Sequence, residues 1–189
     1  EVITDPVAWR LPCLSPNKAR VDRVTKDGES WTWHEFQLTA YHFPGQTLHH
    51  GGLLAEHDGR KLFFVGDSFT PSGMDDYCAH NRNWLGRDVG FQHCLTLIGR
   101  LQPTHMFNCH VDDAFTFTPE EIQFMRRKLD EREQLFGRLV AWDHANFGTD
   151  PLWVRTDPYR QSLRPGDVVQ VQVVLTNHSA EPARYGCRA

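Results

Sequence analysis

The 189-residue sequence lacks an apolar run of the roughly 18 residues that a membrane-spanning helix needs, and no stretch has the form of a signal peptide. It also lacks a basic excess, because 20 Lys and Arg stand against 24 Asp and Glu, for a formal net charge of −4. We therefore expect no membrane span and no nucleic-acid partner. With 40% hydrophobic and 23% charged residues, the composition is that of an ordinary globular protein.

Closely spaced cysteines are missing too. The chain has no C-x-x-C pair, which argues against a disulfide framework and against a zinc knuckle. We expect the five cysteines to be buried free thiols: Cys13, Cys78, Cys94, Cys109 and Cys187. Histidine, in contrast, is plentiful, with 11 residues that gather within 42–57 and 93–110.

Short strand patterns fill the first third of the chain after an irregular lead-in over residues 1–20. Hairpin turns are expected at Asp27-Gly28 and at Asp58-Gly59. Between them, residues 36–43 alternate apolar and polar side chains with the period of a strand. The second arm of the second hairpin, residues 62–65, is apolar enough to be a buried strand.

Two helices and one more strand are expected in the middle of the chain. Apolar residues at helical spacing over 91–101 predict the first helix, and a short buried strand follows over 104–110. Thr118, Pro119 and Glu121 have the pattern of a capping box and predict a second helix that runs to about Val140. Its charged face is expected to be a solvated surface.

The pattern changes from about Trp142, where the sequence becomes rich in aromatic and turn-forming residues. Val169, Val171 and Val173 then alternate with glutamines, which is typical of the opening of a β-sandwich. Such modules need about 100 residues, and only 39 follow position 150. We therefore predict a first domain over 1–145, and over 146–189 a linker with the start of a β-sandwich that is truncated or completed by another chain.

Metal-ligating side chains stand where strands are expected to end. The pair His49-His50 precedes one strand, Asp67 closes FFVGD, and His110 closes MFNCH. Histidine and carboxylate together suit zinc, iron or manganese. A carboxylate can bridge two cations, and two metals about 3.5–4 Å apart share a water that becomes hydroxide at neutral pH. A single histidine at a strand end is, on the other hand, also common as a hydrogen-bonded structural residue.

The order of PGQTLHH, LFFVGDSF and FNCH resembles the second half of the metallo-β-lactamase fold over roughly residues 20–140. The resemblance implies an α/β fold, the αββα metallo-β-lactamase-like type in part, followed here by a C-terminal all-β segment. It implies that Asp67 bridges the metals as a catalytic residue and that His110 is a terminal ligand. It further implies a hydrolase with two divalent metal ions, zinc before iron or manganese, acting on a small-molecule ester, thioester, amide or phosphodiester.

The sequence departs from that family in two places. Gln46 occupies the position where the family's loop has a ligand histidine. Because glutamine is a poor ligand, we expect His50 to bind the metal instead, with His49 on the opposite side of the strand. The H-x-H-x-D-H loop, which supplies most ligands of the first metal, is absent from these residues.

The missing loop leaves three interpretations. In the first, the loop lies upstream of Glu1, and the chain associates with that N-terminal half or forms a homo-oligomer. In the second, the chain is a degenerate scaffold without catalysis that binds a partner. A redox enzyme with two iron ions, which the same fold holds in some relatives, ranks third.

Two further predictions concern the surroundings of the site and the compartment. Asp76, Tyr77, Asn81 and Arg82 are expected either to line the substrate entrance, because they follow Asp67, or to form a solvated loop. No targeting signal indicates a compartment, although a β-sandwich is more typical of an exported protein.

Overall fold

The computed structural model describes residues 20–75, 84–158 and 161–188. They belong to two compact units, one over 25–150 and one that joins residues before 25 to residues from 151 onward. Within these ranges, no helix is both long and apolar enough to span a membrane.

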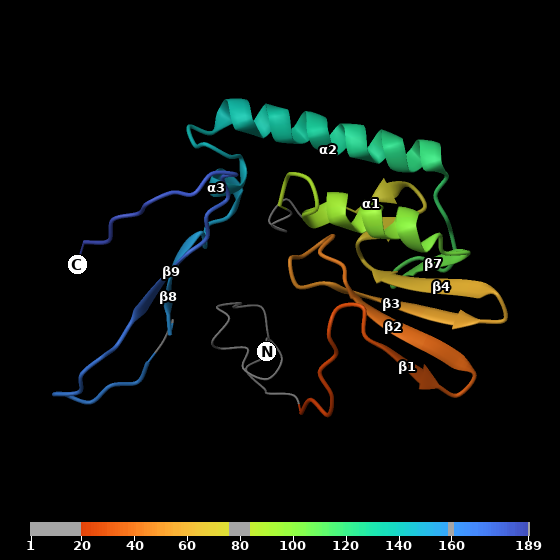
Figure 1. Ribbon diagram of the computed structural model, residues 1–189, viewed down its shortest axis with the longest axis horizontal. Coiled ribbons are helices and arrows are strands. Elements are labelled where there is room, and N and C mark those ends of the chain that lie inside the picture. The colour runs from red at the N-terminus through yellow and green to blue at the C-terminus, as the bar shows by residue number, and fades with distance from the viewer. Residues whose placement is uncertain (1–19, 76–83, 159–160, 189) are drawn as a thin grey trace. The chain divides into compact units, whose positions relative to one another are not determined.

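A five-stranded sheet forms the body of the 25–150 unit, with the strand order β1-β2-β3-β4-β7 (Figure 1). Neighbours from β1 to β4 are antiparallel, whereas β7 runs parallel to β4. The bounds are β1 Ser30–Trp33, β2 Phe36–His42, β3 Gly51–His57, β4 Arg60–Gly66 and β7 His105–Asn108. Between β4 and β7, the short strands β5 Phe69–Thr70 and β6 Gly73–Met74 pair with each other.

Two helices cover one face of this sheet (Figure 1). They are α1 Gly90–Leu101 and α2 Pro119–Leu139, and their apolar sides pack with the sheet into one core. Phe63 and Met106 from the sheet are fully buried there, as are Cys94 and Leu95 from α1. A mixed sheet with helices agrees with the predicted α/β class.

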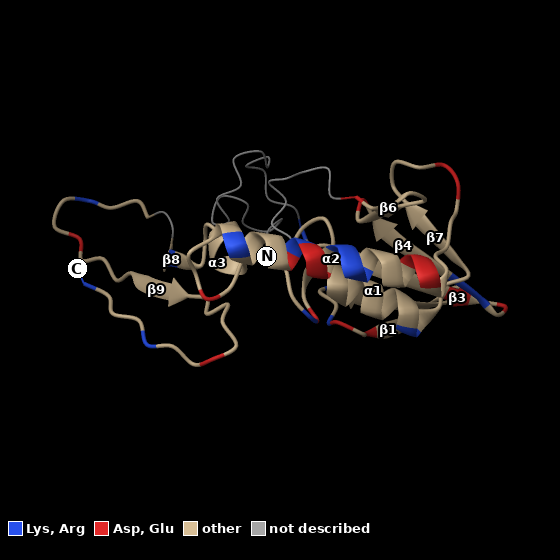
Figure 2. Cartoon of the chain, turned by 90° about the horizontal axis from the view of Figure 1, so that it is seen from above, with Lys and Arg blue, Asp and Glu red and all other residues tan. Residues whose placement is uncertain are grey.

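Both helices begin and end where the sequence predicts. Thr118 accepts a hydrogen bond from the Glu121 amide at 3.2 Å, and the Glu121 carboxylate accepts one from the Thr118 amide at 2.8 Å. This capping box satisfies two amides that the first turn of α2 would leave without a helical partner. Figure 2 shows basic and acidic positions interspersed along α2, and Arg127, Lys128, Asp130 and Glu131 are exposed, which agrees with the predicted solvated face.

The first predicted hairpin is wrong. The turn lies at His34-Glu35 and joins β1 to β2, whereas residues 20–24 form no strand. Asp27 instead caps the end of β2, because its carboxylate accepts a hydrogen bond from the His42 amide at 2.7 Å. The second hairpin, with its turn at Asp58-Gly59, is as predicted.

The C-terminal segments contain less regular structure than the sequence predicts. α3 Asn146–Thr149 still belongs to the 25–150 unit, since the Asn146 side chain bonds the backbone of Leu85. β8 Val154–Asp157 and β9 Gln172–Leu175 form an antiparallel pair. The predicted alternation therefore becomes a strand only from residue 172, and the β-sandwich itself stays a prediction.

Candidate metal centre

The ends of β4 and β7 bring the metal-ligating residues together. These strands are parallel neighbours, with Gly66 opposite Asn108. Parallel strands point their carboxyl ends to the same edge of the sheet. Asp67, which follows β4, and Cys109-His110, which follow β7, therefore emerge side by side.

The three side chains at this edge form a compact group. One ligand atom from each of Asp67, Cys109 and His110 lies within 4.8 Å of the others. His110 Nε2 lies 3.2 Å from Asp67 Oδ1, and the Cys109 thiol donates a hydrogen bond to the same oxygen. The side chain of Asp67 is 27% exposed and that of His110 is 74% exposed, so the group is open to solvent.

His50 lies against the residue that precedes Asp67. Gly66 has a φ of +55°, and a Cβ at this position would collide with Nε2 of the His50 imidazole. Burial lowers the pKa of His50, while the nearby Asp67 carboxylate acts in the opposite direction. A lowered pKa favours the neutral imidazole, which is the form that binds metals.

The two adjacent histidines have different surroundings. His50 is half-buried beside Gly66, whereas His49 is exposed. His50 thus lies near Asp67, although it is outside the group that meets within 4.8 Å. Its role as a ligand stays a prediction, as do those of Asp67 and His110.

The loop that contains Gln46 is held next to the same edge. The Gln46 amide donates to Oγ of buried Ser68 at 3.2 Å, and the Phe43 amide donates to the His50 carbonyl at 2.9 Å. These bonds fix the loop between β2 and β3 beside the segment that follows Asp67. The Pro-Gly corner and the two histidines are therefore part of the site's framework.

The sequence prediction places neither Cys109 nor Asn108 in this site. Cys94 is buried as expected, but Cys109 and Cys187 are exposed, so the prediction of buried thiols is wrong for these two. The hydrogen bond to Asp67 raises the pKa of the Cys109 thiol. Asn108 is buried, and its side-chain amide bonds both the Phe69 carbonyl and the His110 amide, so it links the segments that follow β4 and β7. The only signal of these two residues in the sequence is their position at the end of MFNCH.

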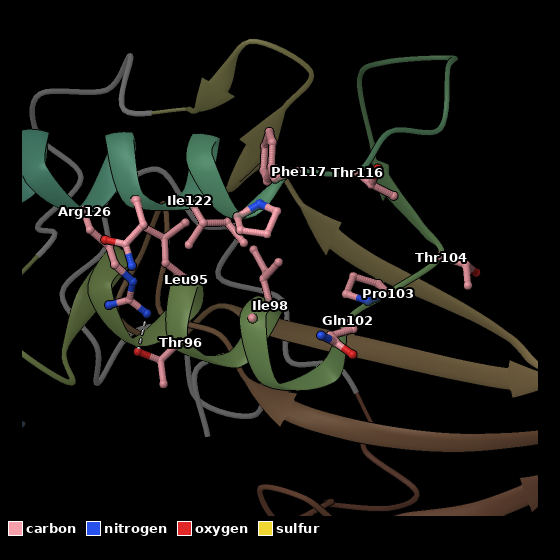
Figure 3. A pocket seen from close by; sticks show the side chains of 13 residues that line it. Leu95, Thr96, Ile98, Gln102, Pro103, Thr104, Thr116, Phe117, Ile122 and Arg126 are labelled. Atoms are coloured by element: carbon pink, nitrogen blue, oxygen red, sulfur yellow. Dashed lines mark hydrogen bonds between the residues drawn. The ribbon is translucent and has the colours of Figure 1, made fainter.

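The predicted residues of the substrate entrance, Asp76, Tyr77, Asn81 and Arg82, lie outside the described residues. The described part of the chain has a different concave feature between α1 and the start of α2, a groove of about 880 Å³. Figure 3 shows Leu95, Ile98 and Ile122 from the two helices in its lining, beside polar side chains such as Gln102 and Arg126. None of its lining residues is a histidine, cysteine or carboxylate, so this groove is separate from the candidate metal centre.

No protein-family model matches the chain, and a search of curated proteins finds no match. Solved structures are similar to the chain at low sequence identity, among them a β-lactamase and two proteins described as metallo-β-lactamases. The β-lactamase from Chitinophaga pinensis has a TM-score of 0.41 and 14% identity, over 69% of this chain and 59% of that one. A Cronobacter sakazakii metallo-β-lactamase with an HARLDQ motif has a TM-score of 0.38 and 13% identity, over 68% and 54%. The MIM-2 metallo-β-lactamase has a TM-score of 0.40 and 19% identity, over 67% and 50%. The chain thus spans between half and three fifths of the length of these structures.

Proposed function

We propose that this chain contributes metal ligands to a hydrolase of the metallo-β-lactamase type. The observation that carries the proposal is the meeting of Asp67 and His110, 3.2 Å apart, at the ends of two adjacent parallel strands. Both residues stand in the motifs that resemble the family, in the family's order along the chain. The position of His50 against Gly66 adds a third donor beside them.

The donors present fit a divalent metal. A carboxylate and imidazoles match the nitrogen and oxygen ligands of zinc, iron and manganese sites. His50 is half-buried with a lowered pKa, which favours its metal-binding form at neutral pH. The exposure of His110 leaves room for a further ligand or a substrate.

Each residue has a defined task in this proposal. Bound metal supplies a Lewis acid and a water of lowered pKa. The Asp67 carboxylate would hold the metal at the end of β4 and would offset part of its positive charge. His50 and His110 would each supply an imidazole nitrogen, and the hydrogen bond between the His110 amide and the Asn108 side chain, at 2.7 Å, fixes the backbone that carries His110.

The substrate class follows from this chemistry as a small-molecule ester, thioester, amide or phosphodiester. A second metal needs further ligands, which a segment with the H-x-H-x-D-H pattern would supply. The partner that we propose is therefore that N-terminal half of the fold. A second copy of this chain lacks the pattern, so a homo-oligomer would have to supply other ligands.

Metal content and hydrolysis test the proposal together. We expect the purified protein to bind zinc, and Asp67→Asn, His110→Ala and His50→Ala each to lower zinc affinity at least about tenfold, because each removes a ligand. His49→Ala is the matched control, since it removes an exposed histidine next to His50. Equilibrium dialysis followed by elemental analysis measures both occupancy and metal identity.

Hydrolysis of a panel of chromogenic esters, thioesters, amides and phosphodiesters is measured with a segment that has the H-x-H-x-D-H pattern supplied; it should depend on the added metal and should be lost in Asp67→Asn. Unchanged zinc binding in all three ligand variants would overturn the metal centre. Stoichiometric zinc binding by the completed protein without metal-dependent hydrolysis of any panel member would overturn the hydrolase and favour a non-catalytic scaffold.

A further inference from the structure

We propose that Cys109 is a direct metal ligand, so that Asp67, Cys109 and His110 form a three-ligand zinc site with mixed oxygen, sulfur and nitrogen donors. The inference rests on the metal centre of the proposed function and adds a ligand to it. Its basis is the group within 4.8 Å, in which the cysteine contacts the carboxylate that is expected to hold the metal.

The spacing of the three donors suits one ion. Zinc binds cysteine sulfur at about 2.3 Å and histidine nitrogen or carboxylate oxygen at about 2.0–2.2 Å, so tetrahedral ligands lie roughly 3.3–3.8 Å apart. The 3.2 Å between His110 Nε2 and Asp67 Oδ1 is close to that separation. The Cys109 sulfur lies in direct contact with the same oxygen, so small side-chain rotations would place all three donors around a cation.

Asn108 holds this arrangement from inside the protein. Its side-chain amide is buried, donates to the Phe69 carbonyl at 2.8 Å and accepts from the His110 amide at 2.7 Å. The loop after β7 is thereby tied to the segment just after Asp67. Cys109 lies between these two fixed residues, so its sulfur remains near Asp67 without a metal. Backbone bracing of this kind lowers the cost of assembling ligands around an ion.

A thiolate also changes which metal the site prefers. Carboxylate and imidazole alone suit zinc, iron and manganese, whereas thiolate favours zinc over the harder manganese ion. On binding, the thiol proton that now points to Asp67 leaves to solvent, and a sulfur–zinc bond takes the place of the sulfur–hydrogen bond. These three donors occupy three positions of a tetrahedral zinc ion, and the fourth is left for His50 of the proposed centre or for a water.

Cobalt(II) is the probe that tests sulfur ligation directly, because thiolate binding to this ion gives a charge-transfer absorption band in the near ultraviolet. We expect the band in the reduced wild-type protein titrated with cobalt, and its loss in Cys109→Ser. Zinc affinity should fall at least about tenfold in the same variant, and the preference for zinc over manganese should shrink. Cys187→Ser is the matched control, because it removes the other exposed described cysteine from outside the 25–150 unit.

The outcomes separate this inference from the proposed function. If Asp67→Asn and His110→Ala lose zinc while Cys109→Ser retains wild-type affinity, the cysteine is not a ligand and the metal centre stands. A wild-type protein that binds cobalt without the charge-transfer band overturns the inference in the same way. If wild-type protein binds neither ion, both the inference and the proposed metal centre are wrong. Far-ultraviolet circular dichroism of Cys109→Ser shows whether the fold is intact, and since the side chain is exposed we expect it to be.

Discussion

Gly66 shows how a single residue lets the candidate centre form. It ends β4 in the left-handed region, with φ at +55°, and the space that its missing Cβ leaves is taken by the His50 imidazole. Two demands, a positive φ and close approach of a ring, thus coincide one residue before Asp67. Glycine alone meets both without strain.

Alanine substitutions at Gly66 and at Gly59 together separate the cost of the positive φ from the cost of displacing the ring. We expect Gly66→Ala to cost about 2 kcal/mol or more of unfolding free energy, because left-handed strain of about 1 kcal/mol adds to displacement of the ring. Zinc affinity should fall as well, since His50 moves. Gly59→Ala is the control, with a φ of +73° and no atom within 4 Å of the added Cβ, so it should cost only the strain. Urea unfolding in EDTA and zinc titration measure the two effects, and equal results for both variants would contradict this account.

At this scale, the sequence predicts the meeting of Asp67 and His110 because each stands at the end of an apolar run, where strand pairing determines position. Cys109 has no such signal. The strand alternation stops at Asn108, so nothing in the pattern tells which way the next side chain points. Strand alternation does not decide between His49 and His50, because β3 begins only at Gly51; the structure has His50 beside Gly66.

Among the elements, α2 depends most visibly on local sequence. It spans 21 residues, yet only Met125 and Leu129 are buried, so tertiary packing stabilises just part of its length. The capping box at Thr118 and Glu121, the proline at its start and the acidic first turn therefore matter more than they would in a buried helix.

Thr118→Ala should accordingly destabilise the protein by about 1 kcal/mol, because the amide of Glu121 loses its partner. Thr116→Ala, two residues earlier in the same exposed segment, should cost less than about 0.5 kcal/mol. Thermal or urea unfolding measures the difference. Equal stability of the two variants would mean that water replaces the cap without cost.

The elements also show where local patterns are sufficient and where they fail. Asp58-Gly59 predicts its hairpin correctly because apolar strands flank it on both sides. Asp27-Gly28 has the same two letters, but the residues before it form no strand, and the aspartate caps β2 instead. A turn signal therefore needs two strands that can pair, which short-range pattern alone does not establish.

On the scale of the whole 25–150 unit, the sheet has one covered face and one apolar face that no described helix covers (Figure 1). Leu53 and Phe107 pair with Phe64 on either side, and Phe64 stacks on Phe107 with ring centroids 5.3 Å apart. Phe64 is nevertheless 44% exposed, and Trp33, the last residue of the edge strand β1, is 56% exposed. Contiguous apolar surface of this kind marks an interface.

We therefore expect the isolated chain to self-associate through this face, since flat apolar sheet faces pack on one another. Phe64→Lys should weaken the association at least about tenfold, because two desolvated charges would meet at the interface. Phe124→Lys is the matched control, an aromatic residue with 54% exposure on α2, and it should leave association unchanged. Sedimentation velocity over a range of concentrations measures the monomer fraction of each variant. A wild-type chain that stays monomeric throughout, or an equal effect of both substitutions, would exclude this face as the contact between copies.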